Sequence, residues 1–528
     1  MSRLLSKRAP PSEPPSGGRT TASRRLSAGA SGMAVLLASL DAYVVVAILV
    51  DIVRDLNVPL NHLEQATPIV TGYLLGYVAA MPLLGQLSDR LGRMRVLQGS
   101  LLVFALGSAA SALAHSLVFL VGARLVQGSA AGAMLPVTFA VVGDQWEASR
   151  RHVPLGVVGS LQEVGSVLGP LYGAVLAAAI GWRGLFWVNI PLAVAAVVVI
   201  GITRPGRGPA PEQRVDVGGG AILTFALACI IVGFYNPNPS ASLLGPWGPW
   251  ALALGAAGLV AFGLWERRSP IRLVKAAPGW GSPFGATLST SFLSGVALMV
   301  TLVDVPLVAE TLYGKNALGS ALLLSRFLAA LALGALVSGV LASRLGERLV
   351  ALVGLAIATA GFVLIGNWPL QALSGRIHLA LVSLPRPDLD LPIAGLGLGL
   401  VVAPLASMAL RSSRPEDHGA ASAAVVAARM MGMLVGIGAL AAWGLHRFQT
   451  LTVHLTFPPL PPGIVGGAAS TDYLAKVAAY EHGVRAALHT EYGEIFHITA
   501  VICVVAAVIC LGLRRRVPAP PPTVDAPE

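Results

Sequence analysis

Long runs of apolar residues alternate with short polar or proline-rich connections along almost the whole chain. An α-helix needs about 20 mostly apolar residues to cross the hydrocarbon core of a bilayer, and these runs have that length. They lack the period-2 alternation of barrel strands, so they predict helices. Fourteen runs are centred near residues 43, 77, 105, 130, 166, 193, 226, 257, 296, 329, 359, 401, 432 and 503. The pattern therefore predicts an all-α polytopic membrane protein.

The basic residues orient these predicted helices. Most of the 36 Lys and Arg residues fall in the two terminal segments and in the connections that follow even-numbered helices. Because cytoplasmic connections are enriched in Lys and Arg, this distribution predicts fourteen spans with both termini in the cytoplasm. Residues 1–30 are rich in Pro, Ser and Arg and lack the apolar core of a signal peptide, so they predict a disordered cytoplasmic tail. Residues 514–528 predict a second cytoplasmic tail.

The overall composition agrees with a membrane protein and narrows the function. With 55% hydrophobic and 12% charged residues, the chain has too little polar surface for a water-soluble globule of 528 residues. The net charge of +11 is scattered over short connections, which indicates an orientation signal and argues against nucleic-acid binding. The ten histidines show no catalytic spacing with acids, and the three cysteines lie in apolar runs. These patterns disfavour a membrane-embedded lipid enzyme, a metal site and a cofactor site.

A ten-residue turn occurs twice, as GQLSDRLGRM at 85–94 and as GVLASRLGER at 339–348. Two six-helix bundles would place these turns after helices 2 and 8, but the second copy follows the tenth predicted helix. Two extra helices therefore lie between the bundles, in a 6+2+6 arrangement. This predicts an N-terminal bundle over 31–203, a linker with the two extra spans over 204–281, and a C-terminal bundle over 282–513. Duplicated bundles around a central site are typical of secondary transporters.

The first copy of the turn, GQLSDRLGRMRVL, resembles the cytoplasmic motif G-x-L-x-D-R-x-G-R-[RK] of the major facilitator superfamily. The matching residues are Gly85, Leu87, Asp89, Arg90, Gly92 and Arg93. Met94 departs from the motif, and Arg95 is a replacement for the missing charge. The resemblance implies that Asp89 and its arginines latch the cytoplasmic side shut when the protein faces outward. A turn that only orients the chain by charge is the alternative.

Two further segments carry the resemblance. RLVQGSAAGAMLP is similar to the helix 4 motif R-x-x-Q-G-x-x-x-A, whose arginine the family places beside the proton pathway, and LQEVGSVLGPLYG is similar to the antiporter signature G-x-x-x-G-P-x-x-G. The matching residues are Arg124, Gln127 and Gly128 in the first, and Gly165, Gly169, Pro170 and Gly173 in the second. Importers of the superfamily generally lack this signature, so the resemblance implies export. A plain packing face of small residues is the alternative.

LDAYVVVAILVDIVRDL and WRGLFWVNIP resemble the fourteen-span drug:proton antiporter branch, although Tyr43, Val46 and Val50 replace its usual Thr, Asn and Pro. Stretches such as GFYNPNP, SAAVVAARMMGML and YGEIFHITA resemble the mycobacterial exporters of triacylglyceride and drugs. This resemblance implies a monomeric, proton-coupled lipid exporter in the plasma membrane of an actinobacterium. It also implies a periplasmic lipid-carrying lipoprotein as partner, and the proton gradient as energy source without a cofactor. A general multidrug:proton antiporter is the alternative.

Ionisable residues inside the predicted spans are rare and indicate function by default. Asp41 is expected to carry the coupled proton, with Arg429 of helix 13 as its partner across the cavity. Glu163 is a second proton carrier by the same reasoning. Asp304 and Arg326 are expected either to form a static pair or to take part in transport. A purely structural buried pair is the alternative for Asp41.

Two long segments, 371–390 and 448–492, fall on the predicted periplasmic side. IHLALVSL in the first alternates partly and predicts a short hairpin, and DYLAKVAAYEHGVRAALHTEY in the second predicts a helix. We interpret both as a docking surface for the lipoprotein, with solvated loops as the alternative. The extra spans are expected to hold the two bundles apart and to leave a lateral entrance for lipid.

Overall fold

The computed structural model describes most of the chain, and the thirteen helices of the described part confirm the all-α prediction. The described residues are 21–56, 66–146, 152–203, 214–236, 242–271, 273, 283–370, 372, 376–379, 382–412, 418–459 and 471–512. The predicted C-terminal tail and residues 1–20 lie outside them. The helix that begins at Thr21 extends into the segment 1–30, which we predicted to be disordered. The last proline before it is Pro15, and the residues from Thr21 onward tolerate a helix.

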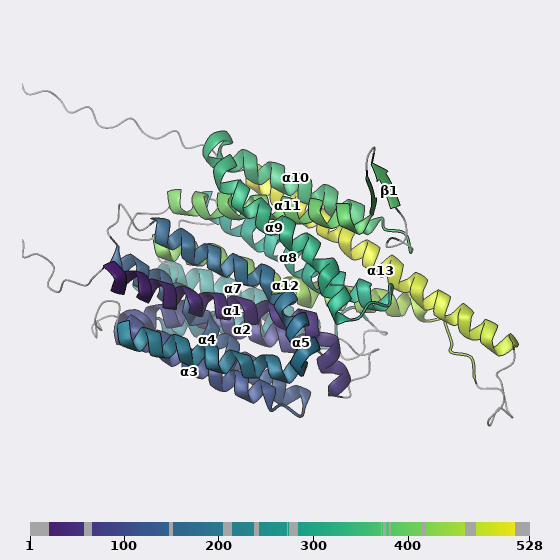
Figure 1. The fold of residues 1–528 in the computed structure, drawn as a ribbon, viewed down its shortest axis with the longest axis horizontal. Coiled ribbons are helices and arrows are strands. Elements are labelled where there is room, and N and C mark those ends of the chain that lie inside the picture. Colours follow the sequence, from purple (N-terminus) through teal and green to yellow (C-terminus); the bar gives the residue numbers. More distant parts are fainter. Residues whose placement is uncertain are drawn as a thin grey trace, which may run out of the picture.

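The helices follow the predicted order, and one small hairpin lies between the tenth and the eleventh of them (Figure 1). They are α1 (Thr21–Asp55), α2 (Thr67–Leu91), α3 (Arg93–Ala112), α4 (Leu117–Gln145), α5 (His152–Thr203), α6 (Val217–Phe234), α7 (Gly248–Arg268), α8 (Pro283–Thr311), α9 (Ala317–Leu345), α10 (Glu347–Gly366), α11 (Pro387–Arg411), α12 (His418–Thr452) and α13 (Thr471–Leu511), with strands β1 (Arg376–Leu379) and β2 (Val382–Pro385) before α11. All thirteen helices of the described part are long and apolar enough to cross a membrane.

The helix α5 accounts for two of the predicted spans. Gly181 within it has a φ of 73° and a ψ of 164°, so the helix is interrupted there. The part before Gly181 packs against α1, and the part after it packs against α3, where Ser108 Oγ donates to the carbonyl of Phe186. The interruption therefore corresponds to the expected boundary between predicted helices 5 and 6. The number of membrane crossings, the domain boundaries and the side on which the termini lie stay predictions.

The two bundles repeat one packing pattern. In the N-terminal bundle α1 packs on the first part of α5, and α2 packs on α4. In the C-terminal bundle α8 packs on α12, and α9 packs on α11. The backbones approach closely in both: a Cβ at Gly128 would lie 2.1 Å from the Tyr73 carbonyl oxygen, and one at Gly432 would lie 1.8 Å from that of Phe292. Small residues at these crossings allow the tight helix contacts that hold membrane bundles together.

The inserted pair α6 and α7 lies along one seam between the bundles. The helix α6 contacts both α2 and α12, whereas α7 is held mainly by α6. Asp216 caps α6 by accepting from Gly219 N, and its carboxylate also accepts from Trp265 Nε1 of α7. We expected the pair to hold the bundles apart, but α2 and α12 touch each other directly, and the pair covers this seam.

Both predictions about the long outer segments concern described residues. The strands β1 and β2 pair antiparallel, with Arg376 opposite Pro385, so the hairpin is confirmed. The predicted helix over DYLAKVAAYEHGVRAALHTEY is also confirmed, but it is not a separate element. It continues without a break into the last apolar run as α13, whose first part projects beyond the bundle (Figure 1).

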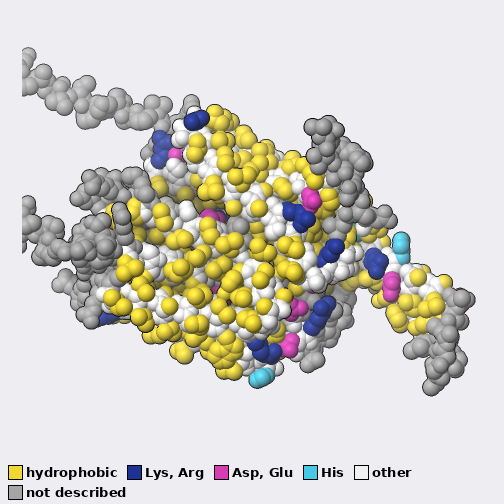
Figure 2. Space-filling view, in the orientation of Figure 1, with side chains coloured by type: hydrophobic (Ala, Val, Ile, Leu, Met, Phe, Trp, Pro, Cys, Tyr) yellow, Lys and Arg dark blue, Asp and Glu magenta, His cyan; other side chains and the backbone are white. Residues whose placement is uncertain are grey.

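The surface agrees with a membrane-embedded bundle. Figure 2 shows hydrophobic side chains over the middle of the visible face and charged side chains mainly toward the two ends of the long axis. Many of the exposed large residues are apolar, such as Leu106, Leu336 and Val508, each 60% or more exposed. Exposed apolar area on this scale is stable only against lipid.

Candidate functional site

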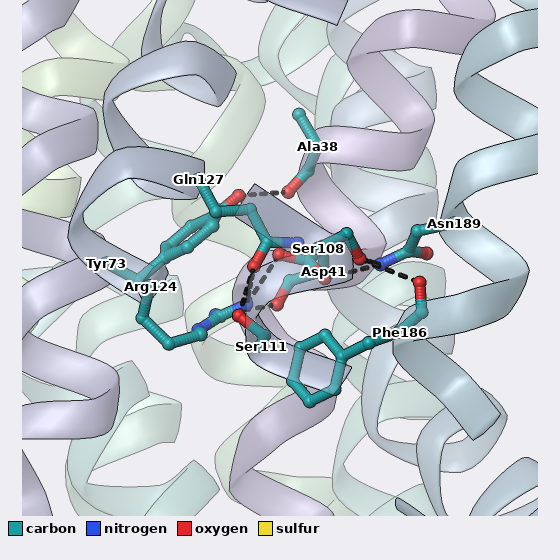
Figure 3. Close-up of polar contacts among 9 residues, drawn as sticks. All are labelled: Ala38, Asp41, Tyr73, Ser108, Ser111, Arg124, Gln127, Phe186 and Asn189. Carbon is teal, nitrogen blue, oxygen red and sulfur yellow. Dashed lines mark hydrogen bonds and ion pairs between the residues drawn. The ribbon is translucent and has the colours of Figure 1, made fainter. Parts of the chain in front are cut away.

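The centre of the N-terminal bundle holds a buried ion pair on Asp41 of α1 (Figure 3). Arg124 Nη1 of α4 donates to Asp41 Oδ2 over 2.7 Å, and both side chains are 0% exposed. Asn189 Nδ2, from the second part of α5, donates to the other carboxylate oxygen over 2.7 Å. Arg124 Nη2 also donates to the backbone oxygen of Asp41. Three helices therefore converge on one carboxylate.

A further layer of side chains fixes the arginine. Gln127 Oε1 accepts a hydrogen bond from Arg124 Nη1 over 3.1 Å, so the two polar residues of the helix 4 motif contact each other directly. The Tyr73 ring lies 4.1 Å from the guanidinium carbon, and its hydroxyl donates to the carbonyl of Ala38. A cation over an aromatic face is stabilised by the ring quadrupole. The guanidinium is thus held by hydrogen bonds and an aromatic face, and its side chain is not exposed to solvent.

The predicted pairing of Asp41 with Arg429 is wrong. Asp41 lies on the face of α1 that meets α4 within its own bundle, where Arg124 reaches it. Asn189 and Tyr73 were missed at the sequence level, although Asn189 lies in WRGLFWVNIP as a polar residue in an apolar run. A buried polar residue in a span calls for a partner, and that signal was available.

Arg429 of α12 is paired with Glu163 of α5, so this ion pair joins the two bundles. Both are predicted intramembrane ions, and the structure brings them together. Their side chains are 10% and 18% exposed. Arg429 Nε has no partner among the described residues. Tyr43 lies close enough to the pair to interact with it electrostatically, and its hydroxyl donates to Met433 Sδ over 3.5 Å.

The expected pair of Asp304 and Arg326 does not form. Arg326 of α9 is paired with Asp388 in the first turn of α11, and both side chains are a quarter or more exposed. Asp304 makes no ion pair within the described part of the chain; it lies deeper on α8, near Glu491 of α13. A single apolar run does not show at what depth a neighbouring helix presents its acid, which is why the pairing failed.

The first copy of the repeated turn forms an ionic cluster inside the N-terminal bundle. Arg93 pairs with Asp89 over 3.1 Å and with Asp144, at the end of α4, over 2.7 Å. Gly92 adopts a φ of 97° between α2 and α3, a conformation that favours glycine. Gly85 approaches Pro136 of α4, and Arg90 is exposed. The predicted pairing of Asp89 with an arginine is confirmed for Arg93. The latching role stays a prediction.

The second copy forms a corresponding bridge with the charges reversed. Glu347, which occupies the position of Arg93, accepts from Arg411 at the end of α11 over 3.2 Å and from Ser407. Gly346 has a φ of 90°, like Gly92. Ser343, in place of Asp89, only donates to the carbonyl of Val340 in its own helix. Each bundle thus ties the start of its third helix to the end of its fourth, with opposite polarity.

The antiporter signature faces α1. A Cβ at Gly165, Gly169 or Gly173 would lie 3.0 Å or less from atoms of Ser39, Leu40 and Val44 respectively. Ser39 Oγ donates to the carbonyl of Gln162 over 2.6 Å across the same contact. Pro170 lies inside α5 between two of these glycines. The signature therefore packs two helices tightly, and its implied link with export stays a prediction.

Comparisons with known proteins agree with the packing pattern. The model of the Major Facilitator Superfamily matches residues 32–437. A triacylglyceride transporter of Mycolicibacterium smegmatis is 48% identical over 497 residues, covering 93% of this chain and 88% of that protein. One of Mycobacterium tuberculosis is 44% identical over 502 residues, covering 94% of this chain and 95% of that protein.

Two solved structures are similar in fold. A bacterial homologue of the human lysosomal transporter Spinster, in an inward-facing and unoccupied conformation, has a TM-score of 0.59 at 15% identity and covers 95% of this chain and 100% of that chain. The human organic anion transporter has a TM-score of 0.53 at 16% identity, covering 91% of this chain and 99% of that chain. At these identities the likeness concerns the arrangement of helices alone.

Proposed function

Because this chain belongs to the Major Facilitator Superfamily, we propose that it exports triacylglyceride-like lipids from the plasma membrane toward the periplasm by proton-coupled alternating access. The lipid substrate is supported by the curated relatives, which are mycobacterial triacylglyceride transporters at 43–48% identity. Proton coupling is supported by one main observation: Asp41 and Arg124 form a fully buried ion pair. A buried carboxylate inside a span is a natural proton carrier.

Protonation of Asp41 changes the balance at this site. The proton removes the charge that holds the guanidinium of Arg124, which then keeps only neutral acceptors, Gln127 Oε1 and the backbone oxygen of Asp41. Because α1, α4 and the second part of α5 all converge there, the change acts on how these helices pack. A proton that binds one conformation better than the other shifts the population toward it. This couples proton movement to alternating access.

The ion pair of Glu163 and Arg429 is the contact that alternating access has to make and break. It joins α5 to α12 and belongs to neither bundle alone. Two partly buried charges are attracted strongly in a medium of low dielectric constant, so the pair favours the conformation that brings the bundles together there. A proton on Glu163 weakens this attraction, which makes Glu163 the second proton carrier.

The lipid is proposed to enter from the bilayer between α5 and α9. The opposite seam, between α2 and α12, is covered by α6. At the α5 and α9 seam the buried contact includes a small cluster of Ala174 and Ala321. The inserted pair packs on α2 and α12 in the described part of the chain, which leaves the α5 and α9 seam as the side for exchange with the bilayer.

The projecting part of α13 and the segment after α12 are proposed to dock the periplasmic lipid-carrying lipoprotein. Val453 is 79% exposed and Phe457 is 60% exposed, and Phe457 packs edge-on against Tyr480 of α13. Leu474 on the same helix is 55% exposed. Apolar side chains beyond the membrane-spanning region suit a partner that carries an acyl chain.

The test is lipid transfer in a defined system. The purified full-length chain, in proteoliposomes with a fluorescent triacylglyceride, is mixed with the acceptor lipoprotein, with and without an imposed pH gradient. We expect transfer that depends on the protein and is accelerated about tenfold or more by the gradient. Gradient-dependent efflux of an amphipathic cationic dye without lipid transfer would establish the alternative, a general multidrug:proton antiporter. Equal transfer with and without the gradient would refute proton coupling.

A further inference from the structure

A groove lies on the outer face of the N-terminal bundle, between α2, α3 and α4. It has a volume of about 440 Å³, within the range of about 300 to 1,000 Å³ typical of ligand pockets. Leu84 and Leu87 of α2 and Val103 of α3 line its sides, and Gly99 and Ser129 lie on α3 and α4. A side chain at Gly99 would meet no atom within 4 Å, so the space in front of it is open. The groove is therefore apolar and wide enough for hydrocarbon.

The groove ends at an arginine, Arg95, that has no partner among the described residues. Arg95, in the first turn of α3, lines the groove and is exposed. Its neighbour Arg93 is neutralised by Asp89 and Asp144, but Arg95 makes no ion pair or hydrogen bond among the described residues. The N-terminus of α3, where backbone N–H groups are free, adds positive potential, and Gly92 supplies no side-chain cap there. This end of the groove therefore favours an anion.

The repeated turn shows that this arginine is not a requirement of the fold. In the C-terminal bundle the position of Arg95 is occupied by Leu349, which is 50% exposed. The helices α9, α10 and α11 pack as α2, α3 and α4 do, but without a cation at that place. The turn can therefore form without a cation at this position, and the charge of Arg95 is a specific feature of the groove.

We propose that the groove binds an anionic phospholipid of the cytoplasmic leaflet, with one acyl chain along the apolar walls and the headgroup phosphate on Arg95. The α2–α3 turn lies on the predicted cytoplasmic side, where anionic headgroups bind basic pockets between membrane helices. An arginine matches the geometry of a phosphate. All lining residues of the groove lie on α2, α3 and α4, so it is separate from the proposed lipid entrance between α5 and α9.

The proposal is tested by lipid titration of the full-length chain in detergent, with binding followed by native mass spectrometry. The probes are dioleoylphosphatidylglycerol, dioleoylphosphatidylcholine and inorganic phosphate. We expect phosphatidylglycerol to bind most tightly and Arg95→Gln to weaken it about fivefold, as the loss of one basic contact at a membrane surface implies. Arg344→Gln is the matched control, because Arg344 is exposed at the second copy of the turn. It should leave binding unchanged.

A second variant tests the groove itself without removing charge. Gly99→Leu places a side chain in the open space and should weaken the binding of phosphatidylglycerol, whereas Gly122→Leu, at a helical glycine of α4 that also faces open space outside the groove, should not. The proposal is overturned by equal affinity for the two phospholipids, by equal losses in Arg95→Gln and Arg344→Gln, or by no effect of Gly99→Leu. Protection from thermal unfolding by inorganic phosphate alone, as strong as that by phosphatidylglycerol, would show a phosphate site and overturn the lipid site.

Discussion

Single side chains decide where charge is held inside this protein. Asp41, Arg124 and Asn189 come from three helices and satisfy one another with bonds of 2.7 Å to each carboxylate oxygen. In a bilayer such a group is stable only because every polar atom of the carboxylate has a donor. The same completeness makes a change of one proton consequential, because both side chains of the ion pair are fully buried and bulk solvent does not reach them.

Replacement of Asp41 by Asn is expected to remove the dependence of lipid transfer on the pH gradient. Asparagine keeps the shape and can still accept from Arg124, but it cannot carry a proton. Transfer with a gradient should fall at least tenfold, to the rate without one, measured in the proteoliposome assay. Asp51→Asn is the matched control, since Asp51 lies further along α1 and makes no ion pair among the described residues. Persistence of the gradient effect in Asp41→Asn would exclude Asp41 as the carrier.

Loss of the arginine is expected to cost stability as well. Arg124→Gln leaves the Asp41 carboxylate buried with only Asn189 as a side-chain donor. Removing one partner of a buried ion pair destabilises by about 3–5 kcal/mol. The thermal unfolding temperature of the purified protein should therefore fall clearly, and the double variant Asp41→Asn with Arg124→Gln should recover part of the loss. A double variant less stable than either single variant contradicts this account.

At the scale of elements, the two copies of the repeated turn use one geometry with different charges. Each turns at a glycine of positive φ and then ties the third helix of its bundle to the fourth, through Arg93 and Asp144 or through Glu347 and Arg411. The first copy adds a second acid, Asp89, from the preceding helix. It therefore connects three helices where the second copy connects two, and the asymmetry noticed between the copies has a physical meaning.

Asp89→Asn is expected to impair export far more than Ser343→Ala. The asparagine removes one of the two acids that hold Arg93, whereas the serine hydroxyl only bonds within its own helix. The transfer rate should fall severalfold in the first variant and stay within about twofold of the unchanged protein in the second. The same assay and matched protein amounts serve both. Equal effects would reduce both turns to signals of topology.

At the scale of the whole molecule, function depends on how the two bundles meet. An ion pair of Glu163 and Arg429 joins them, one seam is covered by α6, and the other brings α5 against α9. The inserted pair adds no charged side chain to the described ion pairs between the bundles. The inserted pair covers one side, and the proposed lipid entrance lies at the other seam, between α5 and α9.

Exchange of the two charges tests the contact between the bundles. Glu163→Arg and Arg429→Glu each place like charges together in a region of low dielectric constant, so each should slow transfer severalfold or more. The double variant restores opposite charges and should recover part of the rate, because residues in contact show coupling of about 0.5–3 kcal/mol. A double variant as slow as the worse single variant would mean that the pair does not act as a unit.

Much of the architecture could be predicted from local patterns, because a membrane-spanning helix is recognised by its length and its hydropathy. The repeated turn, the hairpin over IHLALVSL and the interruption between the predicted helices 5 and 6 all follow from local chemistry: charge, alternation and a glycine at 181. The helix over DYLAKVAAYEHGVRAALHTEY was also readable. The continuity of this helix with the last apolar run could not be predicted, because the local sequence does not show whether two helical segments join without a break.

By itself, therefore, the sequence determined the helices, their duplication and the residues that carry charge inside the membrane. Only the tertiary structure decided which charges meet. Asp41 bonds to Arg124 and not to Arg429, Arg429 to Glu163, and Arg326 to Asp388 and not to Asp304. An ion pair depends on the rotation and depth of two helices relative to each other, and these are set by the packing of many small residues across the bundle, which no single apolar run contains.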